Sequence, residues 1–105
     1  MNFAVIGVGS FGLKRAQSIK DSLKGTLIAI IDPNQENLTK AENALKVSSS
    51  TLEKVLLDKS IDVICICAPN KFHKDLIIKS LNSGKYVFCE KPLATNLQEA
   101  LDVNK

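Results

Sequence analysis

The stretch Val5-Ile6-Gly7-Val8-Gly9-Ser10-Phe11-Gly12 places three glycines directly after a short apolar run. The run begins at Asn2 and is typical of a buried strand, and the residues from about Leu13 to Lys24 have the spacing of an amphipathic helix. A G-x-G-x-x-G pattern between a strand and a helix is the arrangement that receives the pyrophosphate of a dinucleotide. The stretch therefore predicts a β-α unit with an anion-binding turn.

Each glycine of the pattern has a physical task. Gly7 permits the tight turn, Gly9 lets phosphates approach the backbone, and Gly12 lets helix and strand pack closely. The phosphates would lie at the helix N-terminus, where unpaired amides and the helix dipole favour anions. The candidate cofactor-binding residues of this turn are Gly7, Gly9, Ser10, Phe11 and Gly12. The alternative is a glycine cluster that only makes a turn.

Apolar runs and helix-period segments alternate along the rest of the chain. We expect further strands over Thr26–Ile31, near Val47 (short and weak), over Asp62–Cys67 and over Lys85–Cys89. We expect further helices over Pro33–Leu45, after a capping box at Ser50–Glu53, from Pro69-Asn70 to Ser83, and from Thr95 or Asn96 to Lys105, with Gly25 and Gly84 ending two of the helices. This alternation predicts a Rossmann-type α/β fold, a doubly wound parallel sheet in the order 3-2-1-4-5 with helices on both faces.

Composition limits the class of protein. The chain has 105 residues, 45% of them hydrophobic and 24% charged, which fits one soluble domain. Its longest apolar stretch, Leu27–Ile31, is far short of the roughly 20 residues that a membrane span needs. The net charge of +3 comes from interleaved charges, which argues against a nucleic-acid footprint. No secretory signal precedes the first strand, and three cysteines in apolar surroundings favour reduced core thiols over a disulfide or a zinc site, so we expect a cytoplasmic protein.

Asp32 follows the second predicted strand, 20 residues beyond Gly12. An acidic side chain at that point accepts hydrogen bonds from the adenosine ribose of NAD. Its charge would repel the 2′-phosphate of NADP, and no arginine lies nearby in the sequence, so NAD is favoured over NADP. The alternative role of Asp32 is the N-cap of the helix that begins at Pro33.

The second half of the chain carries a more specific signature. Pro69-Asn70 is followed by His73, and a Gly84-Lys85-Tyr86-Val87-Phe88-Cys89 strand leads into Glu90-Lys91-Pro92. In this order and with the glycine-rich turn before them, these residues resemble the N-terminal half of the glucose-fructose oxidoreductase, inositol dehydrogenase and rhizopine-catabolism (Gfo/Idh/MocA) family. The resemblance covers the whole chain. Ala68 departs from it, since many relatives have a threonine before the proline.

The resemblance implies hydride transfer between a nicotinamide cofactor and a hydroxyl of a sugar, cyclitol or related polyol. It makes Lys91 the candidate catalytic residue, because a partly desolvated ammonium polarises an alkoxide and can exchange its proton. Pro69, Asn70, His73, Glu90 and Lys91 are the further candidate cofactor-binding residues. For His73 a packing or capping role is the alternative to a catalytic one, and for Glu90-Lys91 the alternative is an exposed ion pair.

Relatives of this kind continue into a β-sheet domain that binds the polyol and often forms an oligomer interface. We therefore expect this chain to bind NAD but not to turn over substrate alone, and to self-associate through a face that the second domain would cover. Two other classes remain open from the residues. One is a stand-alone nucleotide-sensing or protein-binding Rossmann module, and the other is a methyltransferase-like domain that binds S-adenosylmethionine.

Overall fold

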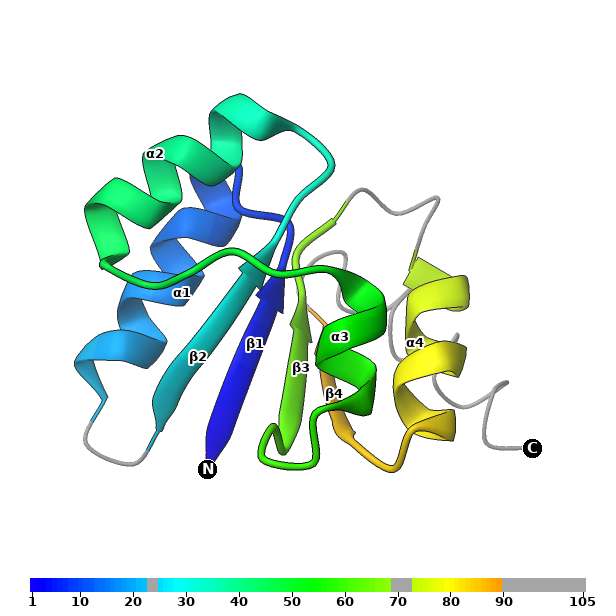
Figure 1. The fold of residues 1–105 in the computed structure, drawn as a ribbon. Helices are drawn as coiled ribbons and strands as arrows, with labels where there is room; N and C mark the ends of the chain where they lie inside the picture. Colours follow the sequence, from blue (N-terminus) through cyan, green and yellow to red (C-terminus); the bar gives the residue numbers. More distant parts are fainter. Residues whose placement is uncertain (23–24, 69–72, 90–105) are drawn as a thin grey trace.

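A four-stranded parallel sheet forms the centre of the computed structural model, which describes residues 1–22, 25–68 and 73–89 (Figure 1). The strand order is β2-β1-β3-β4. The elements are, in chain order, β1 (Asn2–Ile6), α1 (Ser10–Asp21), β2 (Thr26–Ile31), α2 (Gln35–Leu45), α3 (Leu52–Leu57), β3 (Val63–Ile66), α4 (His73–Asn82) and β4 (Tyr86–Cys89). The Rossmann-type α/β class predicted from the sequence is confirmed.

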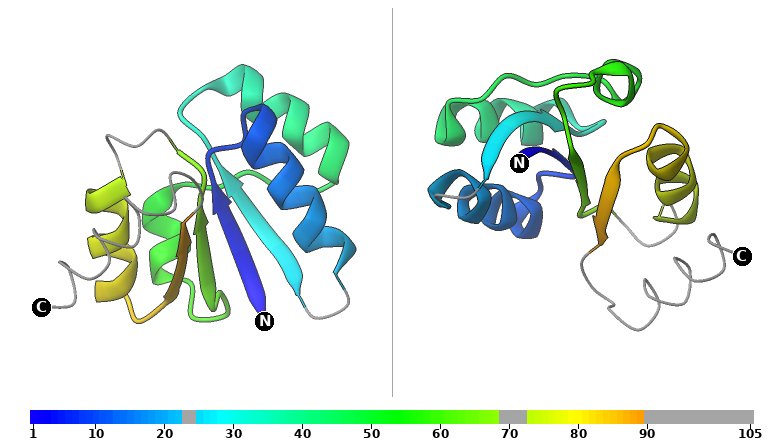
Figure 2. Two further views of the ribbon diagram at one scale, coloured as in Figure 1. Left: turned by 180° about the vertical axis from the view of Figure 1, so that it is seen from behind. Right: turned by 90° about the horizontal axis from the view of Figure 1, so that it is seen from below.

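Helices cover both faces of the sheet, as the end-on view of Figure 2 shows. Side chains alternate along β1, so that Val5 points into one core and Ala4 and Ile6 into the other. The first core is completed by α1 and α2, for example through Ala16 and Leu45. The second is completed by α3 and α4. The strands β1, β2 and β3 are therefore largely buried between two helical layers, which is why they are apolar nearly throughout, whereas Tyr86 and Phe88 of β4 are exposed.

The predicted third strand is present in the structure only as a single bridge. Near Val47 the chain makes only an isolated parallel bridge, between Ser49 and Ile30 of β2. This bridge lies beside β2, where the expected order 3-2-1-4-5 puts the third strand. Three successive serines, Ser48 to Ser50, supply no apolar side chains for a longer strand to bury, which accounts for the difference.

The helix starts differ from those predicted by one to three residues. Helix α1 begins at Ser10 rather than Leu13, and α2 begins at Gln35 rather than Pro33, with Asn34 as its N-cap. Helix α3 is capped by the Thr51 side chain, which accepts a hydrogen bond from the backbone N–H of Lys54, and not by Ser50. The expected last helix, from Thr95 or Asn96, lies outside the described residues.

The two glycines that were expected to end helices have different roles. Gly84 has φ +83° and follows α4, as a left-handed C-terminal residue should. Gly25 is not such a residue: α1 ends at Asp21, and only Gly7 and Gly84 among the described glycines have positive φ. A Cβ at Gly25 would lie 2.8 Å from the Phe3 ring, so the glycine there makes room for an aromatic side chain.

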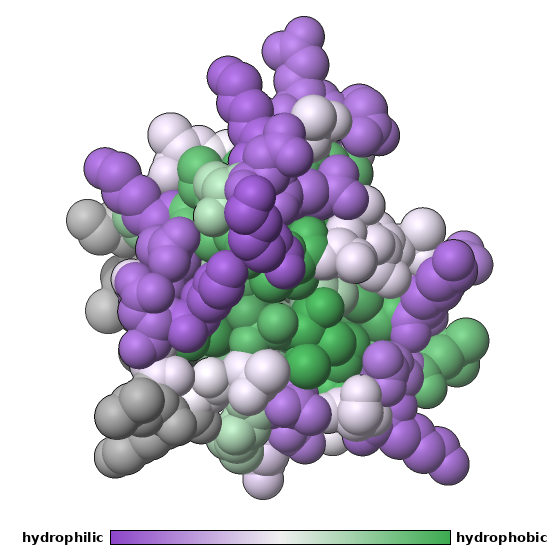
Figure 3. Space-filling view, turned by 60° about the vertical axis from the view of Figure 1, so that its left-hand side comes forward, coloured by the Kyte–Doolittle hydropathy of each residue, from purple (hydrophilic) through white to green (hydrophobic). Residues whose placement is uncertain are grey.

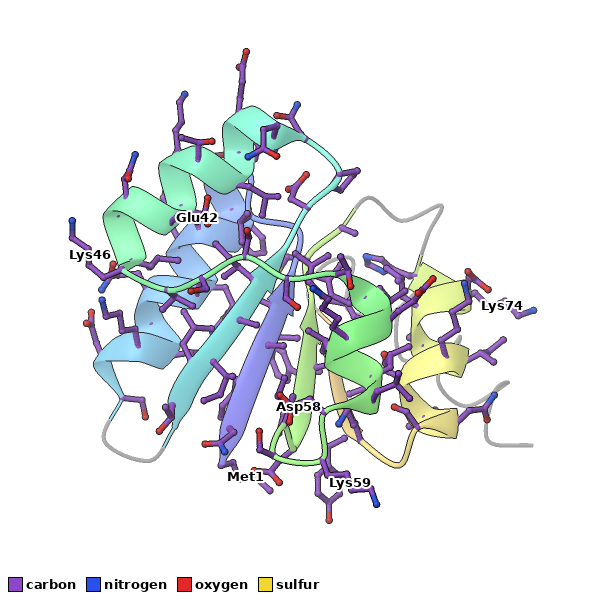
Figure 4. The ribbon with its side chains drawn as sticks, viewed as in Figure 1. Met1, Glu42, Lys46, Asp58, Lys59 and Lys74 are labelled. Carbon is purple, nitrogen blue, oxygen red and sulfur yellow. The ribbon has the colours of Figure 1, made fainter. Side chains whose placement is uncertain are left out.

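Lys85 joins α3, β3 and β4 at the edge of the sheet where the strands begin. Its side chain is 7% exposed, and its Nζ donates to the carbonyl oxygens of Asp58 (2.7 Å) and Ile61 (2.8 Å). Asp58 and Lys59 lie at this edge, near Met1 (Figure 4). Hydrogen bonds from the hydroxyl and backbone N–H of Ser60, with the charge of Lys85, hold the pKa of Asp58 below its ordinary value. A hollow of about 470 Å³ opens beside these residues.

The outer surface is mixed in character. From the side on which α1 and α2 lie, hydrophilic side chains surround an apolar area (Figure 3). The helices of the described residues are too short and too polar for a membrane span.

Candidate functional site

The glycine-rich turn between β1 and α1 is closely packed at two of its three glycines. Gly7 has φ +91°, and a Cβ there would lie 2.8 Å from the backbone of Cys67 and Ala68 at the end of β3. A Cβ at Gly12 would lie 1.7 Å from the carbonyl oxygen of Gly7. Backbone atoms cannot move aside cheaply, so both positions need glycine for the close packing that the pattern predicted.

Gly9 is different, because open space lies where its side chain would be. The nearest atom to a Cβ at Gly9 is Nδ2 of Asn37, at 3.8 Å, and its backbone is extended with φ −66°. The glycine is not required by its neighbours in the fold. It leaves the backbone open to a ligand on that side, which is the use predicted for the second glycine of the pattern.

The N-terminus of α1 has no side-chain partner. Gly9 is its N-cap and makes no side-chain hydrogen bond, and the first turn carries no acidic residue. By contrast, α2 has Asn34 as cap with Glu36 in its first turn, and α3 has Thr51 with Glu53. The first amides of a helix need acceptors, so of these three helices α1 is the one whose start an anion would complete.

Asp32 connects this turn to the start of α2. Its Oδ2 accepts from the backbone N–H of Val8 at 2.9 Å and from Nδ2 of Asn37 at 3.3 Å, and its Oδ1 accepts from the N–H of Asn34 at 2.8 Å. The N-cap alternative for Asp32 was wrong, because Asn34 caps α2 through a hydrogen bond from the N–H of Asn37. Asp32 therefore lies at the glycine-rich turn, where a ribose beside the phosphates would reach it.

The first turn of α1 carries two exposed side chains beside the glycines. Ser10 is exposed and Phe11 is 46% exposed. The structure thus brings Gly7, Gly9, Gly12 and Asp32 together with these two residues at one edge of the sheet. Contact with a cofactor stays a prediction for all six.

His73 is the first described residue of α4 (His73–Asn82), and the helix start expected at Pro69-Asn70 lies outside the described residues. The His73 side chain is 1% exposed, and its Nε2 donates to the carbonyl oxygen of Ala68 at 2.5 Å. This bond ties the start of α4 to the end of β3. The role of His73 that the structure supports is to position the chain around Ala68. Four other predicted residues, Pro69, Asn70, Glu90 and Lys91, lie outside the described residues.

Cys65 and Cys67 lie side by side on β3 and just after it, with their Sγ atoms 4.0 Å apart. Cys65 is buried in the core with Val5, and Cys67 packs against that core. In the described part of the chain, no three His, Cys, Asp or Glu residues come together as they would around a metal ion.

Sequence reasoning missed Asn34 and Asn37. Asn34 had a readable signal, since asparagine is a favoured N-cap and the residue after Asp32-Pro33 is a natural helix start. Asn37 had none, because its side chain meets Asp32 and Gly9 only through the fold.

The residues fit a dinucleotide. The backbone at Gly9 is open to a ligand, and a side chain at this position would cover it. The first amides of α1 have no side-chain cap, and the Asp32 carboxylate lies beside the same turn. These are the features needed for a pyrophosphate and its neighbouring ribose.

Comparison with known proteins agrees with this geometry. The model of an oxidoreductase family described as having an NAD-binding Rossmann fold (Gfo/Idh/MocA) matches residues 1–105. The chain is 32% identical to the 2,7-anhydro-N-acetylneuraminate hydratase of Escherichia coli strain K12, over 100% of this chain and 28% of that protein. It is 34% identical to the scyllo-inositol 2-dehydrogenase (NAD(+)) of Bacillus subtilis strain 168, over 92% of this chain and 29% of that protein.

A solved structure gives the same result. The myo-inositol 2-dehydrogenase of Lactobacillus plantarum superposes with a TM-score of 0.81 and 31% identity, over 99% of this chain and 32% of that chain. The chain therefore spans less than a third of the length of these three proteins. The family match over every residue, together with the glycine-rich turn and Asp32, shows that this chain belongs to the Gfo/Idh/MocA oxidoreductase family as its NAD-binding Rossmann-fold domain.

Proposed function

We propose that this chain is the cofactor half of a dehydrogenase that acts on a hydroxyl of a cyclitol, sugar or related polyol. The observation that supports cofactor binding is the start of α1, which has no side-chain cap and lies next to the close approach of Gly12 to Gly7. Asp32 is hydrogen-bonded to the same turn. The substrate part rests on the relatives that are named as inositol dehydrogenases, at 34% and 31% identity.

The chain's own residues divide the work of binding. The first amides of α1 would receive the pyrophosphate, and Gly9 would let it approach. Asp32 would accept from the adenosine ribose, which favours NAD over NADP because a 2′-phosphate would meet its negative charge. A bound NAD⁺ would supply the hydride acceptor: the carbon that bears the hydroxyl would lose a hydride, the hydroxyl would lose its proton, and the alcohol would become a carbonyl.

Lys91 is our candidate for the group that receives that proton. This assignment rests on the resemblance of the Glu90-Lys91-Pro92 motif to the family. Asn70 and Pro69 are proposed cofactor contacts on the same basis. Since relatives are about three times as long as this chain, we propose that substrate is held by sequence of the kind they have beyond this domain, which also leaves the identity of the polyol open.

Thermal unfolding with NADH, NADPH or S-adenosylmethionine tests the cofactor. A ligand bound only by the folded state at 100 times its dissociation constant adds about 2.7 kcal/mol to the free energy of unfolding. We expect the largest shift with NADH. A shift with S-adenosylmethionine alone would refute the cofactor assignment.

The Asp32→Ala variant tests the ribose contact, with Asp58→Ala as its matched control. Both carboxylates accept from the backbone N–H two residues later, at 2.8 and 2.9 Å, but only Asp32 lies at the glycine-rich turn. We expect Asp32→Ala to lower NADH affinity and Asp58→Ala to leave it unchanged. Equal affinities in the two variants would remove Asp32 from the site.

The reaction is tested with polyols and NAD⁺. We expect NADH production only when the substrate-binding part is present, and its loss in Lys91→Met with NADH binding retained. A Lys91→Met protein that still oxidises polyols would exclude the role of Lys91. A chain that binds NADH but supports no polyol oxidation in any form would favour the sensing or protein-binding module instead.

A further inference from the structure

Asn37 lies where the two parts of the cofactor site meet. It belongs to the first turn of α2, and its Nδ2 donates to Asp32 Oδ2 at 3.3 Å. The same nitrogen lies 3.8 Å from the position of a Cβ at Gly9. The amide end of this side chain therefore lies next to both the carboxylate and the open side of the glycine-rich turn.

Helix capping does not explain this side chain. In a capping box, the residue three after the cap reaches back to the backbone N–H of the cap. Here Asp32 accepts from that N–H of Asn34, and Asn34 in turn accepts from the backbone N–H of Asn37. Both donors are satisfied without the Asn37 amide, so its contact with Asp32 has another use.

Counting acceptors shows what that use is. A carboxylate accepts about four hydrogen bonds, and three on Asp32 are taken by Val8, Asn34 and Asn37. A ribose diol donates two O–H groups, so Asp32 has room for one of them. A carboxylate only accepts, which means that the amide nitrogen of Asn37 faces Asp32 and its carbonyl Oδ1 is a second acceptor beside it. No hydrogen bond to Asn37 Oδ1 occurs among residues 1–22, 25–68 and 73–89.

We infer that Asn37 is a specificity-determining residue: Asp32 accepts from one hydroxyl of the adenosine ribose and the Asn37 carbonyl accepts from the other. The inference rests on NAD binding at this turn. The Asn37 carbonyl would add a second source of selectivity for NAD over NADP. A 2′-phosphate in place of the hydroxyl would bring its acceptor oxygens against the carbonyl oxygen, which is also an acceptor. Asp32 beside it and Glu36 in the same turn of α2 add negative charge and offer no compensation for that phosphate.

The test compares the affinities of NADH and NADPH for the protein and two variants. We expect Asn37→Leu to weaken NADH binding about tenfold, as the loss of one hydrogen bond does, and not to weaken NADPH binding, because the acceptor that opposes the 2′-phosphate is removed. Gln35→Leu is the matched control: it removes an amide from the same turn, one that donates to Thr39 Oγ1 at 3.3 Å, and should alter neither affinity.

A second variant keeps the test informative if Asn37→Leu lowers stability. Asn37→Arg supplies a guanidinium for the 2′-phosphate, and we expect the NADPH-to-NADH preference to rise about tenfold. Unchanged NADH affinity in Asn37→Leu, an equal loss for both cofactors, or an unchanged preference in Asn37→Arg would overturn the inference. A parent protein that fails to bind NADH would instead overturn the cofactor assignment on which it rests.

Discussion

The two edges of the sheet contain the same local turn, in which an aspartate accepts from the backbone N–H two residues later, but the surroundings of the turn differ. At the edge where the strands end, Asp32 accepts from the N–H of Asn34, and at the edge where they begin, Asp58 accepts from the N–H of Ser60. The strand-start edge has the hollow of about 470 Å³, yet a buried lysine satisfies its carbonyls. The strand-end edge leaves the first amides of α1 without a side-chain cap.

The difference teaches which observation marks a site. A hollow measures only the shape of the surface, and beside this one the carbonyls of Asp58 and Ile61 already have Lys85 as their donor. Uncapped amides next to an anchored carboxylate indicate a ligand, because the fold has not supplied the acceptors that a helix start needs. We therefore place the proposed site at the strand-end edge, where the first amides of α1 have no side-chain cap.

The largest expected effect separates two glycines of one turn. Gly12→Ala places a methyl group 1.7 Å from a backbone oxygen, so we expect a loss of about 3 kcal/mol or more in the free energy of unfolding. Gly9→Ala meets nothing closer than 3.8 Å, so we expect little loss of stability but markedly weaker NADH binding. Chemical denaturation and NADH titration of both variants measure the two quantities. Equal stability of the two variants would contradict the assigned roles.

A smaller effect is expected at the opposite edge. Lys85→Met keeps a similar volume but leaves the carbonyls of Asp58 and Ile61 without this donor, which should cost about 2 kcal/mol of stability. NADH affinity should stay as it is, since the edge contains no part of the proposed site. A drop in affinity at constant stability would mean that the two edges are coupled.

The smallest effect concerns acid. The lowered pKa of Asp58 means that the folded state holds this carboxylate ionised more strongly than the unfolded chain does. Its contribution is fully present above the unfolded pKa and is lost as the pH falls through the folded one. We expect Asp58→Asn to be less stable than the parent at neutral pH and equal to it in strong acid, as followed by thermal unfolding. A difference that persists in strong acid would show that the side chain acts by packing.

Sequence reasoning predicted the features that depend on near neighbours. The Gly7 turn, the close approach at Gly12 and the left-handed Gly84 all follow from one residue and its local backbone, and the structure has each of them. The apolar runs gave four strands of a parallel sheet in the expected order.

The features that it missed depend on contacts made by folding. Gly25 lies against the ring of Phe3, which no helix-stop rule considers. Asp32 bonds to Val8, 24 residues earlier, and the cap position of α2 belongs to Asn34 instead. The weak strand near Val47 lacked the apolar residues to extend beyond one bridge. Contacts between residues far apart in the sequence could be identified only from the folded structure.

The buried Lys85 is joined to residues made much earlier in the chain. A protein is made from its amino end, and early parts can fold before later ones exist. The contacts of Gly7 and Asp32 described above involve residues no later than Ala68. Ile61, by contrast, gains its lysine donor only when the chain has grown by another 24 residues. A nascent chain that ends before Lys85 therefore already contains the residues named above as contacts of Gly7 and Asp32. The carbonyl of Ile61, in the turn between α3 and β3, still lacks the lysine donor at that point.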